Sequence, residues 1–145
     1  MTPAVEVQGV KKSFGDHVAV QDLSFSVPQG TIYGFLGPNG AGKTTTLRML
    51  IGIYHPDSGS VHVLGQRNPQ SVREQIGYLP EERGIYDKMK LLDVLRYFGQ
   101  LKGMSAAAAN ARATELLQRF GLGEWQQHKC QDLSKGMTQK AQILA

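Results

Sequence analysis

The sequence is poor in cysteine, in long apolar runs and in clustered charge, and each absence excludes something. The single cysteine, Cys130, rules out a disulfide within the chain and is typical of a reducing compartment. No apolar run approaches the roughly 18 residues of a membrane-spanning helix, and the first residues do not form a signal peptide. The 16 Lys and Arg residues are spread along the chain, so the net charge of +4 does not by itself argue for nucleic acid, and no nucleic-acid partner is expected.

The apolar pattern predicts a folded α/β chain. With 145 residues, of which 41% are hydrophobic and 19% charged, the chain can form a core. Residues 5–10 and 23–27 alternate apolar and polar side chains around a turn signal at Gly15, which predicts an antiparallel β layer. Further strands are predicted at 32–36, 60–64 and 76–80, and we expect the first of these to be buried on both faces.

Helical spacing of apolar residues begins after this β layer and dominates the second half. A helix is predicted from Thr44 to Ile51, with Gly52 closing its end. Residues 73–75 are expected to be helical or turn-like. Two helices are predicted at about 92–101 and 105–120, with buried stripes that include Leu101 and Phe120.

A glycine-rich segment lies between the strand predicted at 32–36 and the helix that follows. It fits the phosphate-binding pattern G-x-x-x-x-G-K-[ST], whose members here are Gly37, Pro38, Asn39, Gly40, Ala41, Gly42, Lys43, Thr44 and Thr45. Its glycines allow successive backbone N–H groups to surround phosphate oxygens, and the helix presents its positive end to the same anion. We expect Lys43 to contact the β- and γ-phosphates and Thr44 to offer its hydroxyl to Mg²⁺.

Two further features each allow a purely structural interpretation and a functional one. Phe14, at the end of the first strand, is either an ordinary packed aromatic or a platform on which a base stacks. Ser134, followed by Lys135 and Gly136, is well placed to cap a final helix. The same serine and glycine at a helix N-terminus would also suit a second phosphate contact.

In this order and spacing, residues from about Val5 to Ala145 resemble the N-terminal part of an ATP-binding-cassette (ABC) transporter ATPase domain, with the sodium or drug exporters of bacteria as the nearest type. The segment 37–45 resembles the Walker A loop, and Phe14 lies where the family has its adenine-stacking aromatic. The segment 76–81 resembles the Q-loop, and 133–137 resembles the LSGGQ signature. The resemblance implies an α/β P-loop NTPase fold with an antiparallel β layer, a partial parallel sheet with helices, and a helical subdomain.

Two positions differ from the family pattern. Glu81 replaces the Q-loop glutamine; its carboxylate can still reach Mg²⁺ but cannot donate a hydrogen bond to the attacking water when ionised. The signature has Lys135 and Met137 where the family has glycine and glutamine. Ser134 and Gly136, which the resemblance assigns to the γ-phosphate contact, are retained. The metal ligands implied are therefore Thr44 and Glu81.

The resemblance also implies boundaries and partners. We expect a β layer and P-loop core at 1–85, a helical subdomain at 86–131, and the signature segment with the following helix at 132–145. No Walker B strand with its glutamate follows, so no catalytic residue is assigned, and the chain is interpreted as a truncated ATPase that is inactive in hydrolysis alone. The cofactors implied are ATP and Mg²⁺. The partners implied are a second ATP-binding domain and a membrane-spanning transporter subunit, at the cytoplasmic face of a bacterial membrane.

Two other functions compete with transport. An ABC-type ATPase that acts on ribosomes or nucleic acid would usually carry paired cassettes or long insertions, and none is visible in these residues. A small P-loop kinase or GTPase would need, for guanine specificity, a segment similar to N-K-x-D, and the sequence has none. An ATP-binding transporter subunit is therefore the favoured interpretation.

Overall fold

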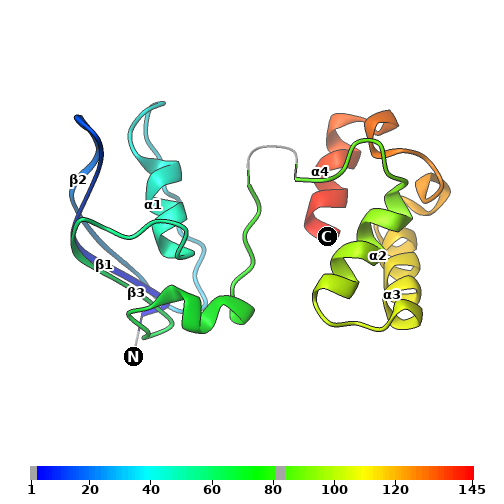
Figure 1. The fold of residues 1–145 in the computed structure, drawn as a ribbon, viewed down its shortest axis with the longest axis horizontal. Coiled ribbons are helices and arrows are strands. Elements are labelled where there is room, and N and C mark those ends of the chain that lie inside the picture. The colour runs from blue at the N-terminus through cyan, green and yellow to red at the C-terminus, as the bar shows by residue number, and fades with distance from the viewer. Residues whose placement is uncertain (1–2, 81–83) are drawn as a thin grey trace. The chain divides into compact units, whose positions relative to one another are not determined.

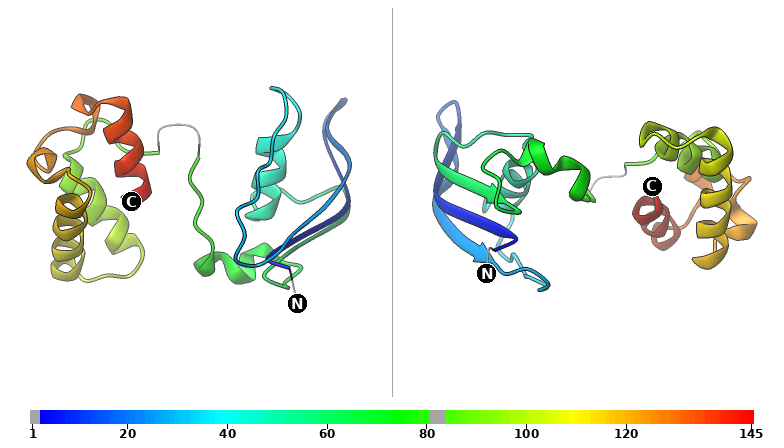
Figure 2. Two further views of the ribbon diagram at one scale, coloured as in Figure 1. Left: turned by 180° about the vertical axis from the view of Figure 1, so that it is seen from behind. Right: turned by 90° about the horizontal axis from the view of Figure 1, so that it is seen from below.

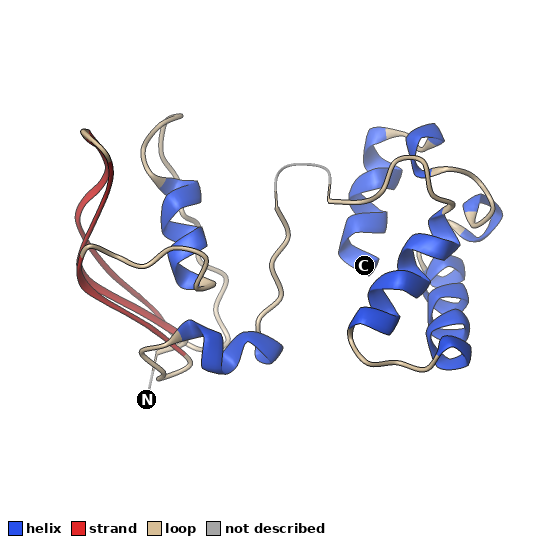
Figure 3. Cartoon of the chain, in the orientation of Figure 1, coloured by secondary structure: helices blue, strands red, loops and turns tan. Residues whose placement is uncertain are grey.

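The computed structural model describes residues 3–80 and 84–145, which form two compact units (Figure 1). The first unit ends at Tyr78 and contains the described strands. The second begins at Leu79 and is helical (Figure 3). Each unit has a hydrophobic core of its own.

The sheet of the first unit has the strand order β2-β1-β3, and both of its pairings are antiparallel. Its strands are β1 (Val5–Phe14), β2 (His17–Val27) and β3 (Ser58–Val63). The predicted antiparallel β layer is confirmed, and so is the strand predicted at 60–64, which corresponds to β3. Strand β1 continues past Gly9, as expected, through an irregular register in which Gly9 adopts a φ of 55°.

One face of this sheet is covered by the helix α1 (Lys43–Leu50), as Figure 2 shows from behind and below. The 3₁₀ helix η1 (Pro69–Gln75) follows β3 and includes the turn-like segment predicted at 73–75. The core of this unit combines side chains of the three strands with one from α1 and one from η1: Val7, Val10, Val20, Val61, Val63, Met49 and Val72. Leu47 of α1 is 42% exposed, because the buried face of the helix is formed by Thr46 and Met49 instead.

The strand predicted at 32–36 does not form, and its expected burial on both faces is wrong. The Tyr33 ring stacks on Phe25 of β2, with 5.7 Å between ring centroids, and the Phe35 ring packs against it at a tilt, with 5.4 Å between centroids. Ile32 and Leu36 are 104% and 92% exposed. The period-two alternation is thus kept, but a strand also needs a neighbour for its N–H and C=O groups. Among residues 3–80 and 84–145, no strand pairs with this segment.

The strand predicted at 76–80 is also wrong, for the same reason. Its residues have no regular structure, and Tyr78 and Leu79 are 40% and 52% exposed. The parallel part of the predicted sheet is therefore not formed within the described residues, and only its antiparallel part is.

The second unit packs three helices, α2 (Leu91–Leu101), α3 (Ala106–Arg119) and α4 (Lys135–Leu144), with two short 3₁₀ turns, η2 (Gly123–Trp125) and η3 (Cys130–Asp132). The Ser105 side chain accepts a hydrogen bond from the Ala108 N–H at 3.2 Å, so the predicted N-cap of α3 is confirmed. The core contains Ile85, Leu91, Val94, Leu95, Ala113, Leu117, Leu122, Cys130, Leu133 and Ala141.

The ends of two predicted apolar stripes are not buried. Leu101 is 64% exposed and Phe120 is 37% exposed, because each lies in the last turn or at the C-cap of its helix. In contrast, Leu117 of α3 is completely buried. The two leucines therefore provide a matched comparison of core and surface positions.

Replacing Leu117 by alanine should lower the free energy of unfolding of the second unit by about 2–5 kcal/mol, because it leaves a cavity in the core. Leu101→Ala, the control, should change it by less than about 1 kcal/mol. Urea denaturation followed by the fluorescence of Trp125, which packs against this core, measures both. Similar losses for the two variants would contradict the core described above.

Candidate functional site

The glycine loop turns sharply before it enters α1. Gly40 and Gly42 have φ values of 82° and 80°, a conformation that side chains with a Cβ rarely adopt. The Ala41 N–H donates to the Pro38 carbonyl at 3.3 Å and closes the turn. Asn39, Gly40 and Ala41 form an exposed tip, as expected of residues that surround a ligand.

Gly42 also lies directly against the sheet. A Cβ at this position would overlap the carbonyl oxygen of Ala19 in β2 and crowd the Val20 side chain. Behind Gly42, the buried Thr46 donates from its N–H and its hydroxyl to the Gly42 carbonyl, at 2.8 Å and 2.9 Å. The loop is therefore held between β2 and the first turn of α1.

The first turn of α1 presents free hydrogen-bond donors. In the part of the chain that the structure describes, the N–H groups of Lys43, Thr44 and Thr45 have no acceptor. The first turn has no acidic residue, and no side chain caps it. Free donors and the positive end of the helix dipole together suit an anion such as a phosphate.

Lys43 places its ammonium group over the loop. Its Nζ donates to the carbonyl oxygens of Gly37 and Pro38, at 2.6 Å and 2.7 Å, and thus uses two of its three N–H bonds. Thr44 is exposed in the same turn, so its hydroxyl is accessible to a metal ion or to water. The free N–H groups, the Lys43 ammonium and the exposed Thr44 thus all belong to the glycine loop and the first turn of α1.

Phe14 lies at the end of β1, and 44% of its surface is exposed. The turn between β1 and β2 and the glycine loop lie at the same end of the first unit (Figure 1). The Tyr54 ring contacts Phe14 edge to face, with 5.1 Å between centroids and an angle of 67°. The Lys12 Nζ also lies over the Phe14 ring, 5.5 Å from its centroid, so Phe14 is a partly exposed aromatic ring contacted by both Tyr54 and Lys12.

Sequence reasoning missed the polar residues around Phe14. Asp57, which precedes β3, accepts hydrogen bonds from the Lys12 Nζ and the Ser13 N–H, both at 2.7 Å. The Lys12 ammonium and then the Ser13 N–H lower the pKa of the Asp57 carboxyl below its ordinary value. In the sequence, Asp57 lies in the segment 55–59, whose proline, serine and glycine are typical of a turn.

Tyr54 is in turn held by a residue of α1. Arg48 donates to the Tyr54 hydroxyl at 3.4 Å, and its guanidinium carbon lies 5.9 Å from the centre of the Tyr54 ring. The hydrogen bond with Tyr54 is the main cause that raises the pKa of Arg48 above its ordinary value. No local pattern predicts such a chain of contacts, because it joins three segments through side chains.

In the second unit, Ser134 caps α4 as predicted, and its hydroxyl accepts a hydrogen bond from the Met137 N–H at 3.3 Å. Ser134, Lys135 and Gly136 are all exposed, and the first turn of α4 has no acidic residue. The cap is thus a structural role that the geometry supports, and the second phosphate contact stays a prediction.

Of the two predicted metal ligands, Glu81 lies outside the described residues, and only Thr44 can be placed. Within residues 3–80 and 84–145, no group of three or more His, Cys, Asp or Glu side chains could hold a metal ion.

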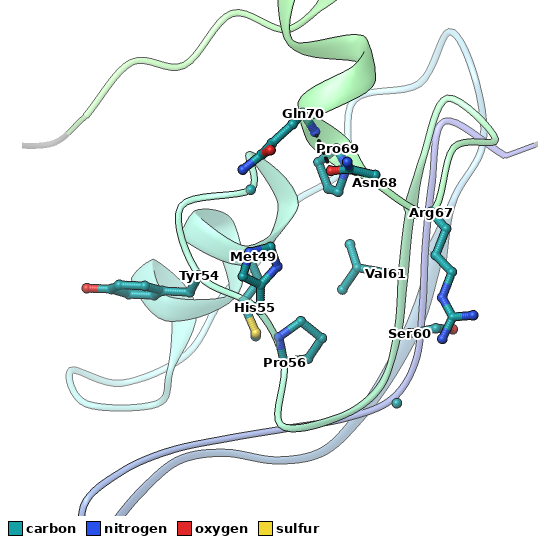
Figure 4. Close-up of a pocket in the computed structure, with 12 residues that line it drawn as sticks. Met49, Tyr54, His55, Pro56, Ser60, Val61, Arg67, Asn68, Pro69 and Gln70 are labelled. Atoms are coloured by element: carbon teal, nitrogen blue, oxygen red, sulfur yellow. Dashed lines mark hydrogen bonds between the residues drawn. The ribbon is translucent and has the colours of Figure 1, made fainter.

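A cavity of about 320 Å³ lies at the other end of α1 (Figure 4). It is bounded by Met49 and Gly52 of the α1 end, by Val61 of β3, and by Pro69 and Gln70 of η1. None of the predicted site residues lines it. Size alone would make it a candidate, but the unpaired donors that suit a phosphate lie at the glycine loop.

The sequence pattern of the family described as ABC transporter matches residues 20–145. The chain is 42% identical to an ABC transporter ATP-binding protein of Bacillus subtilis (strain 168), YhaQ, over 96% of this chain and 47% of that protein. It is 40% identical to the Nod factor export ATP-binding protein I of Burkholderia lata, over 94% of this chain and 46% of that protein.

A solved structure described as an ATP-binding subunit of an ABC transporter superposes with a TM-score of 0.78 at 32% identity, covering 99% of this chain and 60% of that one. The predicted fold class is thereby confirmed. The chain spans about half the length of the curated relatives it matches. Every helix among the described residues is too short or too polar to cross a bilayer.

Replacing Gly42 by alanine should destabilise the first unit by about 3 kcal/mol or more, because strained backbone adds to overlap with the Ala19 carbonyl. Gly40→Ala is the matched control, since its φ is equally positive but nothing lies near its Cβ position, and it should cost only about 1–2 kcal/mol. Urea denaturation followed by far-ultraviolet circular dichroism compares the two. Equal losses would show that the contact with β2 is unimportant.

Proposed function

Because the chain belongs to the ABC transporter family, we propose that its glycine loop binds the triphosphate of ATP. The observation that carries this proposal is the set of free N–H groups at Lys43, Thr44 and Thr45, at the positive end of a helix without acidic residues. The Lys43 ammonium, placed over the same loop, would balance the charge of the β- and γ-phosphates.

The base of the nucleotide is assigned to Phe14. The ring is partly exposed and is contacted by Tyr54 and Lys12. The β1–β2 turn that follows Phe14 lies at the same end of the unit as the glycine loop (Figure 1). A purine stacked on this ring would add favourable contact without a specific hydrogen bond. The base of the nucleotide would thus bind to an aromatic residue, and its phosphates to a helix N-terminus.

Mg²⁺ is the proposed second cofactor. The Thr44 hydroxyl, exposed in the first turn beside the loop, suits one position of its coordination sphere, and Glu81 is the proposed second protein ligand. When bound, the ion would neutralise charge on the β- and γ-phosphates. Binding rather than hydrolysis is proposed for these residues, since none of them is assigned the activation of water.

The segment Ser134, Lys135 and Gly136 is the proposed contact to the γ-phosphate of a nucleotide bound by a second copy of the domain. Its support is the exposed N-terminus of α4, which has no acidic residue in its first turn. Lys135 adds a cation beside the capping serine. Two such domains would then enclose ATP between Lys43 of one copy and Ser134 of the other.

For the whole protein we propose an ATP-hydrolysing subunit that drives a membrane-spanning partner at the cytoplasmic face of a bacterial membrane. The export direction is supported by a relative whose name gives Nod factor export as its role. The proposed boundaries are a P-loop core at 1–85, a helical subdomain at 86–131 and the signature segment at 132–145.

The decisive experiment removes the Lys43 ammonium. For the unaltered chain, ATP with Mg²⁺ at about 100 times its Kd should stabilise the first unit by about 2.7 kcal/mol. Lys43→Ala should abolish this stabilisation in a thermal shift assay, because the phosphates lose their cation. Arg73→Ala, which removes an exposed positive charge from the same unit, should keep it.

An ATP-induced shift that survives in Lys43→Ala would reject the assignment of the phosphate site. A shift that is lost equally in Arg73→Ala would show that only the net charge matters. A strong preference for GTP in competition would instead favour a GTPase.

A further inference from the structure

The tip of the β1–β2 hairpin extends beyond the third strand. Pairing between β1 and β3 ends at Lys11 and Ser58, whereas pairing between β1 and β2 continues to Phe14 and His17. Residues 12–14 thus belong to a two-stranded ribbon. Such a ribbon is marginally stable in water without further support, so the position of Phe14 depends on contacts from outside the hairpin.

Asp57 supplies one such support from the segment that leads into β3. Its backbone N–H donates to the Lys11 carbonyl at 2.9 Å. Its two carboxylate oxygens accept from the Lys12 Nζ and the Ser13 N–H, each at 2.7 Å. Asp57 therefore contacts each of the three residues that precede Phe14, and the side chain of Lys12 is only 16% exposed.

Tyr54 supplies the second support, on the ring itself. Its ring meets Phe14 at 5.1 Å, and its hydroxyl accepts a hydrogen bond from Arg48. The Tyr54 N–H also donates to the Arg48 carbonyl at 3.2 Å. Arg48 belongs to α1, the helix whose first residue is Lys43. The Phe14 ring is thus connected by contacts to the helix that bears the phosphate loop.

We infer that Asp57 and Tyr54 are positioning residues that fix Phe14 relative to the phosphate loop and so set how strongly the base of the nucleotide binds. This inference rests on the proposed binding of ATP. We infer no direct contact of either residue with the nucleotide, since both act through Phe14. Their loss should therefore weaken only the part of the affinity that comes from the base.

A comparison of two ligands separates the affinity that comes from the base from the affinity that comes from the phosphates. ATP contains both the base and the triphosphate, whereas inorganic tripolyphosphate contains only the phosphates. Isothermal titration calorimetry of the 145-residue chain with each ligand, in Mg²⁺, gives the ratio of the two affinities. Asp57→Ala should weaken ATP roughly threefold to tenfold, the range for losing half-exposed hydrogen bonds, and should change tripolyphosphate by less than about twofold.

Further variants make the test specific. Tyr54→Ala should act like Asp57→Ala, and Phe14→Ala should give the largest loss for ATP. Adding Asp57→Ala to Phe14→Ala should cause no further loss, because the positioned ring is already gone. Glu115→Ala is the matched control: it removes a carboxylate from another exposed ion pair, with Arg112 in α3, and should leave both ligands unaffected.

Asp57→Asn provides a milder change in case the alanine variant does not fold. Its side-chain oxygen can still accept from the Ser13 N–H, so only the ion pair with Lys12 is lost. The affinity for ATP should therefore fall less than in Asp57→Ala, and the affinity for tripolyphosphate should not change. Equal weakening of both ligands would mean that Asp57 merely stabilises the fold, and unchanged ATP affinity in Asp57→Ala and Tyr54→Ala would likewise overturn the inference. If neither ligand binds the unaltered chain, the proposed function itself fails.

Discussion

The close contact between Gly42 and the backbone of β2 is the constraint on which the candidate site depends. Because no Cβ fits beside the Ala19 carbonyl, only glycine allows the start of α1 to lie directly on the sheet. Thr46, one turn later, bonds back to Gly42 and buries its own polar atoms in doing so. This contact, together with the packing of Met49 in the core, holds the helix and with it the direction of its free N–H groups. The base platform is carried by the same sheet, since Val20 beside Gly42 pairs with Lys12 two residues before Phe14.

The sequence predicted the local parts of this structure well. The loop, the cap at Ser134 and the antiparallel pairing of β1 and β2 depend on residue types at short spacing, and all are present. The two strands that were wrongly predicted depend on backbone partners distant in sequence. Residues 32–36 have the residue types of a strand and keep its alternation, with Tyr33 and Phe35 packed on Phe25. No strand among the described residues pairs with them, and a pattern of side chains does not specify where their backbone partners come from.

The support of Phe14 was unpredictable for a related reason. Asp57 appeared in the sequence within a cluster of turn residues, where aspartate is common for its own local hydrogen bonds. Its carboxylate instead bonds across to Lys12 and Ser13, at sequence separations of 45 and 44. Arg48 and Tyr54 lie only six residues apart, but the spacing crosses the end of α1 and follows no helical rule. Long-range polar contacts of this kind become visible only when the chain is folded.

The ion pair between Lys12 and Asp57 contributes little to global stability, because water reaches the 46% exposed Asp57 side chain and two side chains must be ordered. Its effect on a two-stranded tip can still be decisive. The free energy needed to distort that tip is far smaller than the free energy of unfolding the unit, so a weak contact is a large fraction of it. Stability measurements would therefore overlook Asp57, whereas a ligand that stacks on the tip responds to its order directly. Because Asp57 contacts the three residues directly before Phe14, we expect this modest interaction to influence the position of the ring and so the binding of the base.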